Sequence, residues 1–109
     1  MTDDMRALTF KAKVFRALAE PKRLCILELL REKEYCACEF IDLIKISQSN
    51  TSRHLKILRD AGIVSYRQEG NKRIYYVTDK RIFRIIDSLD SELVASLSKE
   101  IANRTGIQI

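Results

Sequence analysis

The fold of this chain is limited above all by the stretch from Ser47 to Val77, where a helical pattern is followed by a hairpin pattern. Ser47 is a favourable N-cap, because its hydroxyl can accept a backbone N–H at the start of a helix. Thr51, Leu55 and Leu58 then recur at positions i, i+4 and i+7, which is the spacing of one buried helical face. We therefore predict a helix that begins at Ser47 and packs this face on a core.

The opposite face of the same helix carries small polar side chains and cations at helical spacing: Ser49, Ser52, Arg53 and Lys56. Short polar side chains allow close approach to a DNA major groove, and an arginine can read guanine there. This face predicts a helix that reads DNA.

Two runs of β-branched and aromatic residues, 63–67 and 74–77, predict the strands of a hairpin after the helix. Gly62 is placed to end the helix in a left-handed conformation, and Gly70-Asn71 can supply the positive φ angles of the reversal. Three cations lie on or beside the hairpin tip: Arg67, Lys72 and Arg73. A basic hairpin directly after a basic helix is typical of a winged helix-turn-helix, whose wing contacts DNA phosphates.

The positive charge of the chain is concentrated in this region. Residues 47–78 contain six Lys or Arg and two Asp or Glu, which gives +4 of the net charge of +5. An ordinary solvated surface would spread its charge more evenly, so the local excess favours nucleic acid as the partner. A wing that binds an acidic protein, in an adaptor without an inducer, is the alternative.

Length and composition predict one soluble domain, residues 1–109, that is 46% hydrophobic and 32% charged. No apolar run approaches the length of a membrane span or a signal peptide. We therefore expect a cytoplasmic protein without a membrane partner. His54 is the only histidine, and we expect it to be packed or to contact a phosphate. Nothing in the chain resembles a hydrolase or transferase site.

The remaining pattern predicts a mainly helical α+β fold with about five helices. After a frayed start at residues 1–4, three helices should precede the DNA-reading helix: Arg6–Ala19, Pro21–Arg31 and Tyr35–Ile44. We place the helix-turn-helix at about residues 36–61 and the wing at about residues 63–78. Asp79 is a plausible N-cap for a single last helix over about residues 80–103.

The first and last helices are more apolar than a domain of this size can cover alone. In the first helix we expect Leu8, Phe15 and Leu18 to point inward. The last helix carries a longer apolar stripe: Ile82, Ile86, Leu89, Leu93, Leu97 and Ile101. We predict that the two helices pair across a two-fold axis in a homodimer. Alternatively, the stripe of the last helix covers only the core of its own subunit.

Cys36 and Cys38 are separated by one residue, which in a reducing compartment indicates thiol or metal chemistry. Residues i and i+2 point to nearly opposite sides of a helix, whereas they share a side in an extended segment. We therefore expect that binding one ion between the two sulfurs must unwind the first turn of the third helix. That distortion would move the neighbouring reading helix and release DNA.

Two thiolates without a nearby histidine favour a soft, thiophilic ion. Trivalent arsenic or antimony takes three thiolates, so the third would come from Cys25 or from a small-molecule thiol. Cadmium and lead are the next alternatives. A redox or persulfide sensor is limited by the strain expected of a disulfide between residues so close. Two inert cysteines also remain open, and Cys25 fits a small core residue better than a ligand.

Two segments carry a family resemblance: Phe15–Leu24 (FRALAEPKRL) and Ser47–Leu58 (SQSNTSRHLKIL) closely resemble the ArsR/SmtB family of dimeric metal-sensing repressors. Tyr35–Phe40 (YCACEF) resembles the E-L-C-x-C-D-L signature of its arsenic and cadmium/lead branches. The resemblance implies a repressor that holds its operator until a toxic ion binds at the cysteine pair. It also implies the DNA-facing positions, which are Gln48, Ser49, Ser52 and Arg53, with Arg67, Lys72 and Arg73 on the wing.

The chain departs from the family pattern in three places. Ile41 stands where the arsenic branch often has a further cysteine, and residues 1–20 lack the cysteines of the cadmium/lead branch. Arg81 and Glu92 fall where the histidines of a zinc site on the last helix would be expected. We therefore expect no zinc site there, and we place arsenite or antimonite ahead of cadmium or lead as the inducer.

Overall fold

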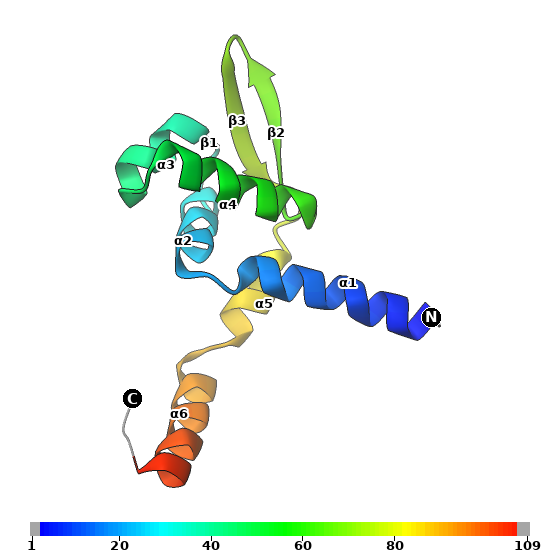
Figure 1. The fold of residues 1–109 in the computed structure, drawn as a ribbon, viewed down its shortest axis with the longest axis vertical. Coiled ribbons are helices and arrows are strands. Elements are labelled where there is room, and N and C mark those ends of the chain that lie inside the picture. The colour runs from blue at the N-terminus through cyan, green and yellow to red at the C-terminus, as the bar shows by residue number, and fades with distance from the viewer. Residues whose placement is uncertain (1–2, 107–109) are drawn as a thin grey trace. The chain divides into compact units, whose positions relative to one another are not determined.

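The structure, a computed structural model, describes residues 3–106 and is mainly helical with one small sheet (Figure 1). Its elements in chain order are α1 (Asp3–Leu18), α2 (Pro21–Leu30), β1 (Tyr35–Cys36), α3 (Ala37–Ile44), α4 (Gln48–Asp60), β2 (Val64–Glu69), β3 (Lys72–Val77), α5 (Ile82–Ser88) and α6 (Ser91–Thr105). The chain divides after Asp79 into two compact units. The predicted α+β winged helix-turn-helix is confirmed, with six helices over the described residues where about five were predicted.

The core of the first unit lies between α2, α3, α4 and the sheet. Seven large side chains are fully buried there: Ile26, Leu27, Phe40, Thr51, Leu55, Leu58 and Val64. Each fully buried large apolar side chain contributes roughly 1.5–3 kcal/mol. The predicted buried face of the reading helix, with Thr51, Leu55 and Leu58, is confirmed.

Helix α1 contributes only its C-terminal end to this core. Ala17 and Leu18 are buried, but Leu8 is 55% exposed and Phe15 is 56% exposed, so the prediction that both point inward is wrong. The reason is that only the end of α1 packs on α2 and α4, while its earlier turns project away from them (Figure 1). The helix starts at Asp3. Of the predicted frayed start, residues 1 and 2 lie outside the described residues.

The third helix starts at Ala37, two residues later than predicted, because Tyr35 and Cys36 form a strand instead. This strand, β1, pairs antiparallel with β3, and Cys36 lies opposite Ile74. Cys36 is also the N-cap of α3, with extended φ and ψ angles of −67° and 145°. The Glu39 carboxylate accepts the Cys36 N–H at 2.9 Å, which secures the start of the helix.

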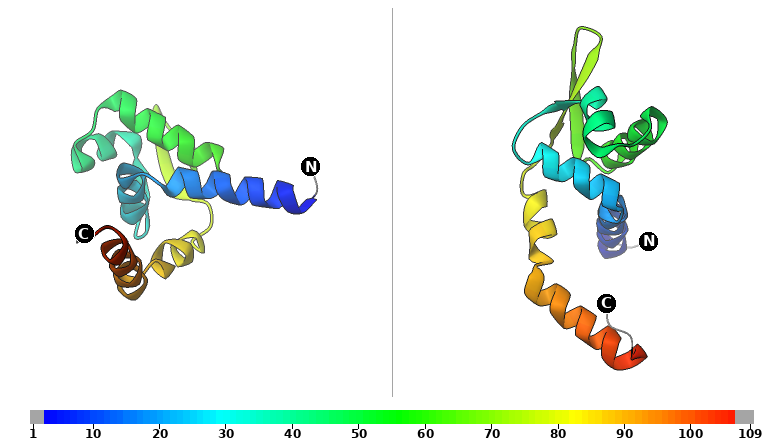
Figure 2. Two further views of the ribbon diagram at one scale, coloured as in Figure 1. Left: turned by 60° about the horizontal axis from the view of Figure 1, so that its bottom comes forward. Right: turned by 90° about the vertical axis from the view of Figure 1, so that its left-hand side faces the viewer.

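The wing spans residues 64–77, close to the predicted 63–78. Its strands reach further toward the tip than predicted, because pairing of β2 and β3 continues to Glu69 and Lys72 and leaves a two-residue turn. Gly70 supplies a positive φ of 63° in that turn. Strand order in the sheet is β1-β3-β2. The hairpin projects beyond the helices of the first unit (Figure 2).

The second unit contains two helices, so the prediction of one long last helix is wrong. Leu89 leaves the helical conformation, with φ −83° and ψ 69°, and Asp90 then caps α6 by accepting the Leu93 N–H at 2.9 Å. The predicted cap Asp79 does not start a helix, since the residue before α5 is Arg81. Figure 2 shows the break between α5 and α6. No helix within residues 3–106 has the length and apolar character needed to cross a membrane.

Candidate nucleic-acid interface

Helix α4 presents the predicted DNA-reading side chains because of how it starts. Lys45, with a left-handed φ of 63°, ends α3 and turns the chain, and the Ser47 hydroxyl then accepts the Asn50 N–H at 3.1 Å. Burial of Thr51 and Leu55 leaves the other face of α4 in solvent. The five candidates on this helix are all exposed: Gln48, Ser49, Ser52, Arg53 and Lys56.

A buried arginine that the sequence analysis did not single out lies behind the reading helix. Arg23 on α2 is 8% exposed and donates to the Ala17 carbonyl at 2.6 Å and the Arg16 carbonyl at 3.2 Å. It also bonds His54 Nδ1 at 3.1 Å. The signal for its burial was present, because Arg23 stands three and four residues before the buried Ile26 and Leu27.

His54 is packed inside the protein, as one of its two predicted roles requires. A guanidinium can only donate, so Nδ1 accepts and the neutral ring carries its proton on Nε2. The Nε2 atom is 3.9 Å from a Glu20 carboxylate oxygen. Burial lowers the pKa of His54, Glu20 opposes this shift, and the charges of Arg53 and Arg23 add to it. The ring is therefore held in its neutral form on the buried face of α4.

The predicted cations differ in how far their charge is already compensated. Lys56 pairs with Asp60 at 2.8 Å, and this hydrogen bond lowers the pKa of Asp60. Arg67 pairs with Glu34 and with Glu69, and the bond to Glu34 is the main cause that raises the pKa of Arg67. Arg53, Lys72 and Arg73 make no ion pair within residues 3–106. Their charge is the most available to a phosphate.

Tyr66 on β2 contacts one arginine of the wing and one arginine of the reading helix. The Arg73 guanidinium lies 4.5 Å and the Arg59 guanidinium 5.2 Å from the centre of its ring. Such cation–π contacts stabilise exposed sites by about 0.5–1 kcal/mol each. Arg59 was not among the predicted site residues. Arg59 lines a small cleft of about 290 Å³ together with Ser52, Lys56 and Arg73.

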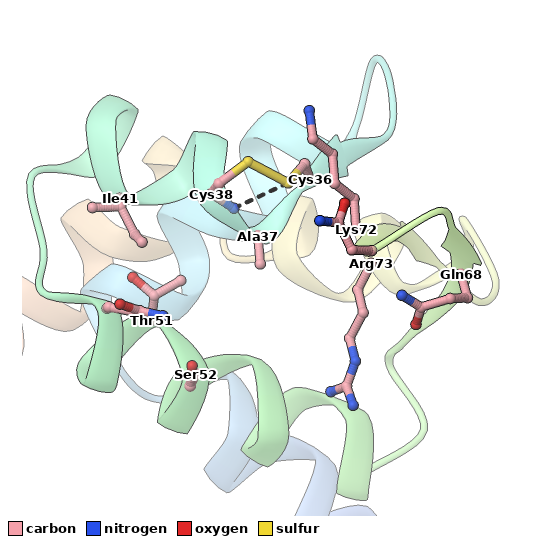
Figure 3. Close-up of a pocket in the computed structure, with 11 residues that line it drawn as sticks. Cys36, Ala37, Cys38, Ile41, Thr51, Ser52, Gln68, Lys72 and Arg73 are labelled. Atoms are coloured by element: carbon pink, nitrogen blue, oxygen red, sulfur yellow. Dashed lines mark hydrogen bonds between the residues drawn. A yellow bond between two sulfur atoms is a disulfide. The ribbon is translucent and has the colours of Figure 1, made fainter.

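A cleft of about 520 Å³ lies between the start of α3, the exposed face of α4 and the wing. It is lined by four of the predicted DNA-facing residues, Gln48, Ser52, Lys72 and Arg73, and by both cysteines, Cys36 and Cys38. Figure 3 shows the Arg73 side chain reaching from the wing toward α4, with the two sulfurs at the edge of the same opening. The structure thus brings the two predicted sites together in one cleft.

The cysteine pair does not have the geometry that the sequence predicted. Cys36 is buried and Cys38 is exposed. Their Sγ atoms are joined in a disulfide (Figure 3), although the short spacing argues against one. Because Cys36 precedes the helix in an extended conformation, both sulfurs reach one point while α3 remains regular. The expected unwinding of α3 assumed that Cys36 lies inside the helix, and this assumption is wrong; ion binding by the pair stays a prediction.

Cys25 is not brought to this pair. It is a free and exposed thiol on α2, so the expectation of a small core residue is also wrong. Within residues 3–106, no three His, Cys, Asp or Glu side chains are grouped as a metal site would require. The chain has no thiol besides these three, so in this conformation the third thiolate of such an ion would come from another molecule.

Comparison with known proteins finds several related regulators. A family model described as bacterial regulatory protein, arsR family, matches residues 20–66. An uncharacterized HTH-type transcriptional regulator of Methanocaldococcus jannaschii is 45% identical over 80 residues, which cover 72% of this chain and 90% of that protein. The arsenical resistance operon repressor of Staphylococcus xylosus is 36% identical, covering 71% and 74% of the two chains. A homologue of the cadmium resistance regulatory protein CadC from Staphylococcus aureus is 35% identical, covering 79% and 74%.

Solved structures with the same fold include two mycobacterial proteins. The crystal structure of Rv0081 from Mycobacterium tuberculosis has a TM-score of 0.74 and 33% identity, and the match covers 93% of this chain and 100% of that chain. The solution structure of a homodimeric winged helix-turn-helix DNA-binding domain from Mycobacterium bovis has a TM-score of 0.71 and 25% identity. That match covers 100% of this chain and 97% of the other.

Proposed function

Because the chain belongs to the arsR family of bacterial transcriptional regulators, we propose that it is a homodimeric repressor released from operator DNA by a thiophilic ion. In this proposal α4 reads the major groove, the wing contacts phosphates, and Cys36 and Cys38 bind the ion. Arsenite or antimonite is the first candidate inducer, with cadmium or lead as the alternative. The protein acts on DNA in the cytoplasm.

The observation that carries DNA binding is the exposed face of α4 beside a basic wing. Arg53, Lys72 and Arg73 have no acidic partner within residues 3–106, and the region 47–78 holds most of the net positive charge. The hydroxyls of Ser49 and Ser52 leave room for a base pair to approach the helix. Phosphate contacts supply affinity, and side chains on α4 supply sequence discrimination.

Homodimer formation is supported by apolar side chains that each unit leaves in solvent. On α1, Phe10 and Phe15 are more than half exposed, and Leu97 on α6 is 51% exposed. Large apolar side chains left in solvent in such numbers are typical of protein interfaces. The similar domain from Mycobacterium bovis is homodimeric. Two subunits would present two copies of α4 to a pseudo-palindromic operator.

The ion proposal is supported by two sulfurs that meet at one point in an accessible cleft. Thiolate pairs select soft ions over magnesium or calcium. One relative is named as an arsenical resistance repressor and another as a cadmium resistance regulator, which supports both candidate inducers. A small-molecule thiol could complete a three-thiolate site, since Cys25 lies elsewhere.

The DNA proposal is tested by titration of duplex DNA at several salt concentrations. We expect a log–log slope for the association constant steeper than about −4, since several cations per subunit meet phosphates. Arg53→Ala should weaken specific binding by about 1–3 kcal/mol and relax sequence preference. Lys22→Ala, which removes an exposed cation of α2, is the matched control and should change little. A slope near zero would favour the protein adaptor instead.

The ion proposal is tested by release of the reduced protein from DNA on addition of arsenite, antimonite, cadmium or lead. We expect Cys36→Ser and Cys38→Ser to abolish release, because each removes one of the two thiolates. Cys25→Ser is the matched control. A normal response in both Cys36→Ser and Cys38→Ser would contradict the ligand assignment, whereas loss in Cys25→Ser would make Cys25 the third ligand.

A redox-responsive repressor is the second candidate, and the Cys36–Cys38 disulfide is the observation that favours it. A peroxide would oxidise the two thiols to a disulfide and would itself be reduced to water. Release from DNA by hydrogen peroxide, reversed by dithiothreitol and absent in Cys38→Ser, would select this candidate. Release by ions under reducing conditions, without a response to peroxide, would exclude it.

A further inference from the structure

The cysteine pair and the proposed DNA-facing residues share a single opening. Cys36, Cys38, Gln48, Ser52, Lys72 and Arg73 all line the cleft of about 520 Å³. Lys72 and Arg73 line it from the wing, and Ser52 lines it from α4, with the Arg73 side chain reaching toward α4 (Figure 3). Cavities of roughly 300–1,000 Å³ hold one small ligand, so this cleft does not have room for two large occupants at once.

The start of α3 cannot withdraw from the cleft without breaking packed structure. Phe40, on the first turn of α3, is fully buried, and Ile44 at its end is 8% exposed. Ahead of the helix, Tyr35 and Cys36 are paired with Tyr75 and Ile74 of the wing. An ion held between the two sulfurs must therefore stay at the rim of this cleft.

We propose that Cys38 belongs to the surface that DNA covers, so that the duplex and the ion exclude one another at this cleft. This inference rests on the proposed function of α4 and the wing in DNA binding. In this inference the ion and DNA compete directly for one surface, and no conformational change of α3 is needed to release DNA. Bound DNA shields the exposed Cys38 thiol, and an ion with its remaining ligands occupies the space that a phosphate would take. The ion captures the free protein and does not attack the complex.

The first test measures whether DNA shields Cys38 and requires no inducer. Reduced protein, freed of reductant, is treated with N-ethylmaleimide alone or bound to a duplex selected from a random library by its affinity for the protein. Peptide mass spectrometry then gives the labelling rate of each cysteine. We expect the labelling rate of Cys38 to be at least about tenfold lower in the complex than in the free protein. Cys25, exposed on α2, is the internal control and should react equally in both. Equal labelling of Cys38 in both samples would overturn the proposal.

The second test compares two dissociation rates of the same protein–DNA complex. Excess unlabelled duplex gives the spontaneous rate, and arsenite or cadmium chloride gives the ion-driven rate. Under competition the ion-driven rate reaches the spontaneous rate and does not exceed it at any ion concentration. A rate that rises in proportion to ion concentration, beyond the spontaneous rate, would show that the ion acts on the complex and would overturn the proposal.

The two tests separate failure of this inference from failure of the proposed function. If no duplex is bound, DNA binding itself is wrong. If DNA binds and neither ion releases it, the ion assignment is wrong, while the labelling of Cys38 still decides whether the thiol lies in the covered surface.

Discussion

Each of the three guanidinium nitrogens of Arg23 makes a hydrogen bond inside the protein. Its three side-chain bonds join the end of α1, through the carbonyls of Ala17 and Arg16, to His54 on α4. A buried cation of this kind is stable only when its donors are satisfied. The bonds also fix the tautomer of His54 and leave Glu20 near the opposite side of the ring. Arg23, His54 and Glu20 thus form a polar cluster on the buried side of the reading helix.

The neutral His54 makes stability dependent on pH. Its pKa is lower in the folded state than the ordinary value of 6.5, mainly because the ring is buried. Between these two values the unfolded chain binds more protons than the folded one, so stability falls as pH decreases through and below about 6.5. We expect the free energy of unfolding to fall by at most about 1.4 kcal/mol per pH unit from this group, the limit for one proton.

Urea denaturation at pH 7.5 and pH 5.5 measures this effect. His54→Asn places an amide oxygen near the position of Nδ1, which keeps an acceptor for Arg23, and it cannot be protonated. It should therefore lose less stability between the two pH values than the wild type. Equal losses in both proteins would show that other groups cause the dependence.

At the scale of elements, local patterns predicted α4 well and β1 not at all. The stripe of Thr51, Leu55 and Leu58 and the cap at Ser47 lie within one segment, so the sequence alone specifies the helix. The two-residue strand β1 exists because Tyr35 and Cys36 find partners on β3, about forty residues later. No local period contains that information. The prediction for the cysteine pair failed for this reason, since it assumed that Cys36 lies inside the helix.

The break between α5 and α6 was missed for a different reason. The apolar stripe of residues 82–101 continues across it, which predicts one helix. Asp90 nevertheless caps a new helix at Ser91, and side-chain bonds of this type compete with helix continuation. The sequence analysis named only Asp79 as a cap, whereas the folded chain uses Asp90.

The two faces of α4 should respond oppositely to substitution. Leu55 is 1% exposed, so Leu55→Ala should lower the free energy of unfolding by about 2–5 kcal/mol, because it leaves a cavity in the core. The neighbouring Lys56 lies on the exposed face, and its pair with Asp60 is a surface ion pair, so Lys56→Ala should cost less than about 1 kcal/mol. Chemical denaturation of the two variants compares them directly, and similar losses would contradict the observed facing of the helix.

At the scale of the whole molecule, exposed apolar side chains are concentrated on helices outside the core of the first unit. On α6, Leu93 is 43%, Leu97 51% and Ile101 41% exposed, and no residue of that helix is buried. A helix of fifteen residues without a buried face is marginal in water. The sequence indicated this excess correctly, because apolar residues can be counted without knowing their partners. What covers them is not encoded in the pattern of a single chain.

The proposed homodimer gives the excess a partner, and sedimentation velocity at about 10 μM protein tests it. We expect a dimer for the wild type and a shift to monomer for Leu97→Glu, because a buried carboxylate in an apolar interface is costly. Lys99→Glu, an exposed position on the same helix, is the matched control for a change to negative charge. A monomeric wild type, or an equal shift in both variants, would contradict an interface at Leu97.

The pairing of Tyr35 and Cys36 with β3 has a consequence for protein engineering. A chimera that takes only the wing, residues 63–78, from a relative would pair a foreign β3 strand with the native residues Tyr35 and Cys36. Grafts that move residues 35–36 and 63–78 together should retain the pairing of β1 with β3 and the extended conformation of Cys36, whereas grafts that split them should lose both.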